Sequence, residues 1–303
     1  MSSMPLFPHF KPLELTDREV INSALWLYQP ETSDLTFTNL FMWRRKYHYQ
    51  WCMHEKWLFL IAKGDNENIY ALEPVGPPSR FEVTLILLKW LDKQSSSLPV
   101  ILRADKRMLN EVNTKDIFET EPIRDHFDYL YSTTDLITLS GRHYHSKRNH
   151  LKRFFKDYQT DYQILSKTQI TKCLDFSSRW CQINHCKKDT SLYDEHVAIS
   201  EAFIHFDQLQ LNGAALYIKG EMVAFTLGEL LNNVTAVIHV EKAFTEFHGI
   251  YAAINQLFCA NRFNHTSFIN REQDLGDDGL RKAKLSYNPV RLVEKFRIKM
   301  KSL

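Results

Sequence analysis

The sequence predicts an α/β protein with mixed sheets, in which one arrangement of strands and helices occurs twice. Three observations support this prediction. The expected elements follow the same order in the two halves of the chain, a polar stretch rich in turn-forming residues separates the halves, and ionisable side chains crowd the end of a late strand.

The first half is expected to begin with a helix and to continue as three strands, a helix, a strand and a further helix. Apolar alternation and turn-forming residues place these elements as follows: a helix at 16–27, an aromatic run at 37–43, strands at 47–51, 57–62 and 69–72, a helix at 80–91, a strand at 100–102 and a helix near 106–112.

The second half repeats this order. The same reasoning predicts strands at 213–218, 222–230 and 234–240, a helix at 250–261, a strand at 267–269, a helix near Leu280 and a last strand at 291–296. The polar stretch 132–141 is the expected boundary, which divides the chain into domains 1–137 and 138–303.

The composition indicates a globular protein of the cytoplasm. The 303 residues are 44% apolar, and the net charge of +2 attracts neither nucleic acid nor membranes globally, so any basic site must be local. DNA is not an expected partner. We expect no signal peptide and no integral membrane segment. The five cysteines are expected to be free thiols, and the spacing of Cys181, His185 and Cys186 matches no zinc pattern, so no metal is predicted.

The segment 268–289 is the strongest candidate for a functional site. An apolar run ends in polar residues, a helix with acids first and bases later follows, and Pro289 marks the exit. Open α/β sheets bind their ligands at the carboxyl ends of strands. The candidate residues of this segment are Asn270, Arg271, Glu272, Asp274, Arg281, Lys284 and Tyr287.

Three carboxylates lie on or beside expected strands, which acids usually avoid: Glu229, Glu241 and Glu272. A half-buried carboxylate suits a general base that deprotonates an amine or hydroxyl, and Glu272 or Glu229 could fill this role. The alternative is internal ion pairing, of Glu241 with Lys242 or Arg271 and of Glu272 with Arg281.

A basic run from Arg142 to Tyr158 contains six lysine and arginine residues before its first acid. Leu151, Phe154, Phe155 and Tyr158 recur at helical spacing and are expected to pack inward. Lys147, Arg148, Lys152 and Arg153 would then project from the other faces. They form either a phosphate-binding patch or a solvated face, and the sequence leaves both open.

Five segments together resemble the family of the phosphatidylglycerol lysyltransferase C-terminal domain. They are DLITLSGRHYHSKRNHLKRF, GEMVAFTLGE, HVEKAF, HGIYAAINQLF and INREQDLGDDGLRKAKLSYNP. The resemblance is close over the second half and extends over the first. It implies two tandem GNAT-like domains, similar to the Fem transferases that use aminoacyl-tRNA, with the active site in the second domain.

The resemblance also implies a reaction. Characterised lysyltransferases take lysine from its tRNA and esterify a lipid, so we expect acyl transfer, specifically of an aminoacyl group from the acceptor stem of tRNA to an amine or hydroxyl. The acceptor could be a lipid, met by peripheral membrane contact, a peptide or a small molecule. The alternatives are an acyl-CoA-dependent N-acetyltransferase and a non-catalytic protein that binds an anionic ligand.

Roles for particular residues follow from the same resemblance. By similarity to GNAT enzymes, Tyr287 would be the general acid. The helix start at Gly249 and Tyr251, together with Glu241 and Lys242, would lie at the donor site, although a single glycine is a weak phosphate-binding signal. No other cofactor than the donor, aminoacyl-tRNA or acyl-CoA, is expected.

Overall fold

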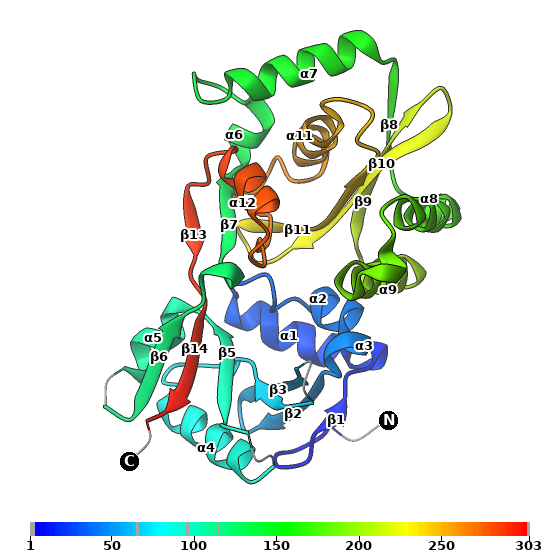
Figure 1. Ribbon diagram of the computed structural model, residues 1–303. Helices are drawn as coiled ribbons and strands as arrows, with labels where there is room; N and C mark the ends of the chain where they lie inside the picture. The colour runs from blue at the N-terminus through cyan, green and yellow to red at the C-terminus, as the bar shows by residue number, and fades with distance from the viewer. Residues whose placement is uncertain (1–3, 65–66, 95–96, 114–115, 302–303) are drawn as a thin grey trace. The chain divides into compact units, whose positions relative to one another are not determined.

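The computed structural model describes residues 4–64, 67–94, 97–113 and 116–301, and the chain divides into two compact units (Figure 1). The first unit contains residues up to Asp128 together with 273–276 and those from Val293 onward. The second contains 129–272 and 277–292. Within the described residues, no helix combines the length and apolar character that crossing a membrane would require.

Each unit is built on a seven-stranded mixed sheet. In the first unit the strands lie in the order β1 (Lys11–Pro12), β2 (Gln50–His54), β3 (Trp57–Lys63), β4 (Ile69–Ala71), β5 (Val100–Ala104), β14 (Phe296–Met300) and β6 (Phe118–Pro122). In the second the order is β8 (Thr160–Ile164), β9 (Asn212–Ile218), β10 (Glu221–Leu230), β11 (Thr235–Ala243), β12 (Phe268–Asn270), β7 (Asp128–Ser132) and β13 (Arg291–Val293).

The two sheets have the same topology, as the repeated element order predicts. In each sheet the first four strands are antiparallel, and the next pair, β4–β5 or β11–β12, is parallel. The sixth strand of each sheet is antiparallel to the fifth. In each sheet a helix precedes the second strand of the parallel pair, so the connection is a crossover, as parallel strands require.

The sixth strand of each sheet comes from the other half of the sequence. β7 follows β6 along the chain but joins the sheet of the second unit, and β14 follows β13 but joins the sheet of the first. The single last strand expected at 291–296 is therefore two strands in two sheets. A division into residues 1–137 and 138–303 would cut inside α6 (Thr133–Thr138) and separate β14 from its sheet.

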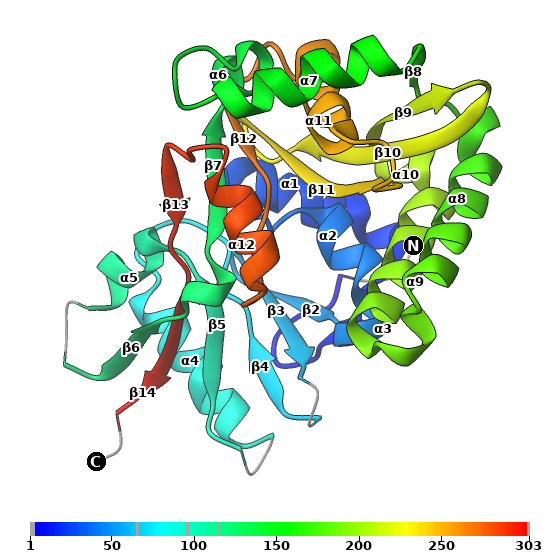
Figure 2. The ribbon, with the colours of Figure 1, turned by 45° about the horizontal axis from the view of Figure 1, so that its top comes forward.

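Helices flank the sheet in each unit. The first unit contains α1 (Arg18–Tyr28), α2 (Phe37–Met42), α3 (Arg44–Tyr47), α4 (Phe81–Asp92) and α5 (Lys106–Val112). The second contains α6, α7 (His145–Asp157), α8 (Ile170–Ile183), α9 (Thr190–Ile204), α10 (Phe206–Leu209), α11 (Ile250–Arg262) and α12 (Asp278–Leu285). In the second unit α11 packs on β9, β10 and β11, and α7 packs on α11 (Figure 2).

Cys181 and Cys186 form a disulfide, so the expectation of free thiols is wrong for these two residues. Helix α8 ends at Ile183, and His185 adopts a left-handed backbone with φ of 54°. This turn brings the two Cα atoms to 5.1 Å, within the range that a disulfide spans. Cys52, Cys173 and Cys259 are free and buried, as expected.

Candidate active site in the second unit

The candidate site lies where the parallel ladder between β11 and β12 ends. The ladder's last pair is Val237 with Asn270, whereas β11 continues to Ala243. Beyond it, the backbone of Arg271 and Glu272 stays hydrogen-bonded to Tyr129 of β7, over N–O distances of 3.0 and 3.2 Å. Between this segment and β11, contacts between side chains replace the backbone hydrogen bonds of the ladder. We call this place the ladder end.

A β-bulge at His239 determines which side chains of β11 lie on each face of the sheet. The β10 partners of Ile238 and Val240 are the adjacent residues Gly228 and Leu227, so His239 is the extra residue. A bulge re-aims the side chains that follow it. Glu241 consequently reaches Asn255 on α11, while Lys242 reaches Glu195 on α9, on the other side.

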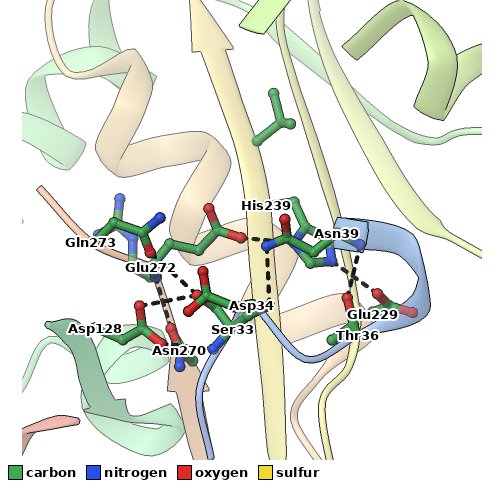
Figure 3. Close-up of polar contacts among 12 residues, drawn as sticks. Ser33, Asp34, Thr36, Asn39, Asp128, Glu229, His239, Asn270, Glu272 and Gln273 are labelled. Atoms are coloured by element: carbon green, nitrogen blue, oxygen red, sulfur yellow. Dashed lines mark hydrogen bonds and ion pairs between the residues drawn. The ribbon is translucent and has the colours of Figure 1, made fainter. Parts of the chain in front are cut away.

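On the face away from α11, His239 lies between two carboxylates (Figure 3). Its Nδ1 is 2.8 Å from Glu272 Oε1, and its Nε2 is 3.0 Å from Glu229 Oε1. A carboxylate can only accept in such a bond, so both ring nitrogens donate and the ring is an imidazolium. We call these three residues the imidazolium clamp.

The clamp is buried and carries net negative charge. Burial of the His239 ring lowers its pKa, but the bonds from Glu229 and Glu272 outweigh burial and raise the pKa to about 9. The His239 side chain is 2% exposed, whereas Glu229 and Glu272 are 14% and 18% exposed. Two carboxylates and one imidazolium sum to one negative charge, and both carboxylates are partly exposed.

On the α11 face, Arg271 forms the centre of a second group. Its Nη2 is 2.5 Å from Glu241 Oε2, and Glu241 Oε1 accepts a hydrogen bond from Asn255 Nδ2 at 2.8 Å. The expected pairing of Glu241 with Arg271 is therefore present. Arg271 Nη1 is buried and has no hydrogen-bond partner among the described residues, and a buried guanidinium usually fills all its donor positions.

Tyr287 and Lys147 complete this group, which we call the cationic cluster. Lys147 Nζ lies 4.0 Å and Arg271 Cζ 4.9 Å from the centre of the Tyr287 ring. Burial and the neighbouring Arg271 lower the pKa of Lys147, and burial raises that of Tyr287, which therefore stays protonated. Two cations against the single carboxylate of Glu241 leave one positive charge.

The position of Lys147 corrects the expectation that it projects outward. Lys147 lies on the same side of α7 as buried Leu151 and Phe154, and Phe155, expected inside, is 43% exposed. Arg148 is also not an outward-pointing ligand, because its guanidinium donates to the carbonyl oxygens of Leu139 and Gly141.

The remaining predicted residues hold the backbone around the ladder end. Lys284 Nζ donates to the Arg271 carbonyl at 2.5 Å, and buried Asn270 accepts from the Glu272 N–H at 2.8 Å. The Tyr251 hydroxyl bonds the Ala243 backbone. Arg281 lies half-buried on α12.

Three predicted residues lie away from the two clusters. Asp274 belongs to the first unit, where it is buried and pairs with Arg124 at 3.2 Å. Lys242 pairs with Glu195 on the α9 side. Gly249 precedes α11 with φ of +93°, and a Cβ there would lie 2.7 Å from the His150 carbonyl oxygen, so this glycine allows α7 to pack against α11.

Sequence reasoning missed His239 and Asn255. The signal for His239 was an imidazole two residues before Glu241 in a strand already suspected of carrying function. Asn255 stands among apolar residues on α11, where a buried amide needs a polar partner. Among the described residues, no group of three or more His, Cys, Asp or Glu is arranged to hold a metal ion.

Comparison with known proteins identifies relatives over nearly the whole chain. Residues 26–299 match the sequence profile of the family described as phosphatidylglycerol lysyltransferase, C-terminal. A crystal structure of a conserved protein of unknown function from Bacteroides thetaiotaomicron is 34% identical, with a TM-score of 0.91 over 96% of this chain and 99% of that one.

Two more distant structures show the fold. L-PGS from Bacillus licheniformis is 15% identical, with a TM-score of 0.65 over 95% of this chain and 93% of that one. A tandem GNAT protein from the clavulanic acid biosynthesis pathway is 7% identical, with a TM-score of 0.51 over 96% of this chain and 98% of that one. The expected fold of two tandem GNAT-like domains is confirmed.

Proposed function

The chain belongs to the family of the phosphatidylglycerol lysyltransferase C-terminal domain, and on this premise we propose that it transfers an aminoacyl group from aminoacyl-tRNA to an amine or hydroxyl. The family and the fold of its relatives support acyl or aminoacyl transfer in general. The choice of donor rests on the chemistry of the ladder end. A lipid, a peptide or a small molecule would each supply a suitable acceptor.

The observation that carries this proposal is the pair of oppositely charged clusters at one ladder end. An aminoacyl ester of RNA bears phosphates and, next to the reacting carbonyl, an ammonium group. The cationic cluster, with one positive charge and a free Nη1 on Arg271, suits a phosphate or a developing oxyanion. The imidazolium clamp, with one negative charge, suits the ammonium group.

In this scheme the acceptor attacks the ester carbonyl, and Arg271 and Lys147 stabilise the resulting oxyanion. Tyr287, protonated because burial raises its pKa, gives its proton to the departing ribose oxygen. The acceptor's proton goes to Glu272 or Glu229. Both carboxylates already accept a hydrogen bond from His239. We therefore assign them to ammonium binding and treat the role of general base as the alternative to be tested.

The acyl-CoA alternative is less well supported. A pyrophosphate would need exposed backbone N–H groups at the start of α11. The backbone of His150 lies against Gly249 at this helix start, where even a methyl group would meet the carbonyl oxygen at 2.7 Å. An acyl-CoA also offers no ammonium group to the imidazolium clamp.

The test compares donors that differ only in the ammonium group. Purified protein is given aminoacyl-RNA or its N-acetylated form with a panel of acceptors, and transfer of the labelled acyl group is measured. We expect the free amine to be preferred by about 10- to 100-fold, the factor of one or two charge-assisted contacts. Acyl-CoA is the control donor. The proposal is wrong if acyl-CoA is the only donor that supports transfer, or if none of the donors supports it.

Glu272→Gln separates the two roles of the carboxylate. If Glu272 binds the ammonium group, the variant loses the preference for the free amine through KM. If Glu272 is the base, kcat falls by roughly 10²–10⁴-fold for both donors, and the preference is unchanged. Thermal stability of the same preparation is measured in parallel, because the variant also loses a bond to His239.

A further inference from the structure

The outward side of α7 carries a ridge of basic residues. Tyr144, Leu151 and Phe154 are buried, which fixes the inner side of the helix. Exposed residues at positions 145, 149, 152 and 156 recur at helical spacing on the opposite side. They span about 16 Å along the axis. We call the exposed set His145, Asn149, Lys152, Arg153 and Lys156 the α7 ridge.

The segment that contains this ridge carries a local excess of positive charge. From Arg142 to Asp157 there are six lysine and arginine residues and one aspartate, which gives +5. Because the whole chain carries +2, the rest of it carries −3. Such separation of charge produces a local field in a nearly neutral protein, and a local field attracts a polyanion to one place.

The two ridge lysines form no ion pair among the described residues. Arg153 pairs with Asp157 at 3.3 Å, but Lys152 and Lys156 have no hydrogen-bond or ion-pair partner among the described residues. They contrast with Lys147 and Arg148 on the same helix, which are turned inward or bound to carbonyl oxygens. The cations that remain available to a partner are thus on the outer side.

We propose that the α7 ridge docks the phosphate backbone of RNA. Phosphates along a strand match a row of cations in which two lysines have no ion-pair partner among the described residues. The solvent side of α7 has one large exposed apolar residue, Phe155, while Leu151 and Phe154 are buried, so α7 lacks the broad apolar face with which a helix enters a membrane surface. A protein partner would require more apolar contact than this ridge offers.

The position of the ridge connects it with the candidate site. Lys147 reaches the cationic cluster from the inner side of the same helix. An RNA backbone on the outer side would lie about one helix diameter, roughly 10 Å, from that cluster. The inference rests on the proposed function in one respect: the docked RNA would be the non-reacting part of the aminoacyl-RNA donor.

The test measures binding without any chemistry. The probe is a fluorescein-labelled RNA hairpin with an unpaired 3′ end and no amino acid, titrated with the full-length protein at several salt concentrations. Lys152→Ala/Lys156→Ala should weaken binding about 10- to 100-fold and reduce the slope of log K against log salt by roughly 1.4–1.8, the value for two lost phosphate contacts. Both substitutions are at exposed positions, and the melting temperature verifies folding.

Lys187→Ala/Lys188→Ala is the matched control, since it removes the same charge from two exposed lysines outside α7. An unchanged slope in this control supports docking on the ridge. Equal weakening by both double variants, no RNA binding by the wild type, or ridge-dependent binding to phosphatidylglycerol vesicles without RNA binding would overturn it. RNA binding that depends on the ridge without any aminoacyl transfer would refute the proposed function alone.

Discussion

The ladder ends of the two units share a backbone but differ in their side chains. The last parallel pair is Ala71 with Ile101 in the first unit and Val237 with Asn270 in the second. Two residues farther along lie Glu73 and Arg103 in one, His239 and Glu272 in the other. Arg103 and Glu272 both have a left-handed backbone, with φ of 62° and 55°, which is uncommon for residues with a side chain. The framework is therefore repeated down to an unfavourable backbone conformation.

In the first unit the polar groups at the ladder end satisfy one another. Glu73 accepts hydrogen bonds from the Tyr28 hydroxyl at 2.9 Å and the Asp105 N–H at 2.7 Å. Burial, and then Asp105, raise the pKa of Glu73 to about 8, so it is protonated at neutral pH. Arg103 pairs with Asp34 at 2.6 Å. This ladder end is a filled structural core.

In the second unit the corresponding groups are charged as groups: the imidazolium clamp sums to one negative charge and the cationic cluster to one positive charge. A buried group with net charge destabilises a fold unless surrounding groups or a ligand offset that charge. The difference teaches that one strand framework supports either a packed polar core or a binding site, and that the balance of acids and bases distinguishes the two.

The largest expected effect comes from breaking one ion pair in each unit. In the first unit buried Arg80 pairs with Glu111 at 2.6 Å. Arg271→Met breaks the ion pair with Glu241, and Arg80→Met breaks the ion pair with Glu111. Each should lower the free energy of unfolding by roughly 3–5 kcal/mol, measured by urea denaturation. Adding Glu241→Gln or Glu111→Gln should restore most of the stability, because the uncompensated charge is removed.

Measuring transfer activity then shows which of the two ion pairs is needed for the reaction. The repaired Arg80 variant should regain activity, and the repaired Arg271 variant should remain inactive. Full activity of Arg271→Met/Glu241→Gln would show that the second unit's pair is as structural as the first unit's pair.

The pH dependence of stability should come from both ladder ends. The pKa of His239 is raised to about 9, so its contribution to the free energy of unfolding is complete below about pH 6.5 and is lost as the pH rises through 9. A shift of this size corresponds to about 3 kcal/mol. His239→Gln should flatten the curve of stability against pH in this window.

Glu73 gives the matching measurement in the first unit. Its raised pKa means that its contribution is complete below about pH 4.5 and is lost as the pH rises through 8, when the buried carboxyl ionises. Glu73→Gln should flatten the curve between about pH 4.5 and 8 and leave unchanged the loss of stability between about pH 8 and 9, which belongs to His239 alone. A His239→Gln variant with the wild-type pH curve above pH 7 would contradict the charged clamp.

The smallest expected effect comes from substituting two adjacent residues of α7, Lys147 and Arg148. Lys147→Met removes a desolvated cation without an acceptor, so stability should hold, while the affinity for the anionic donor should fall by about 1.5–3 kcal/mol, read as KM. Arg148→Met removes bonds to two carbonyl oxygens, so it should lower the melting temperature and leave KM near the wild-type value. If Arg148→Met raised KM and Lys147→Met lowered the melting temperature instead, Arg148 rather than Lys147 would be the donor-binding residue.

The repeated plan could be predicted from the sequence because it depends on local patterns. Alternation, breakers and helical spacing place most strands and helices within a few residues of where they occur, such as α5 at Lys106–Val112. The exchange of β7 and β14 could not be predicted. β14 pairs Phe296 with Ala104, about 190 residues away, and nothing in a short apolar strand specifies so distant a partner.

The site was predicted in part. The segment 268–289 does provide Arg271, Glu272 and Tyr287, and Glu229 and Glu241 join them. Lys147 was placed on the wrong side of α7, although its spacing from Leu151 and Phe154 was visible in the sequence. His239 depends on a bulge and on the left-handed backbone of Glu272, and neither feature leaves a mark in single-residue patterns.

The exchanged strands also determine the order in which the chain can fold. Domains usually form one after another as a polypeptide is synthesised, starting from the amino terminus. Here β5 and β6 stay apart until β14, close to the carboxyl end, inserts between them. The half that is synthesised first must therefore wait for the half that is synthesised last, and the two copies mature as one cooperative unit.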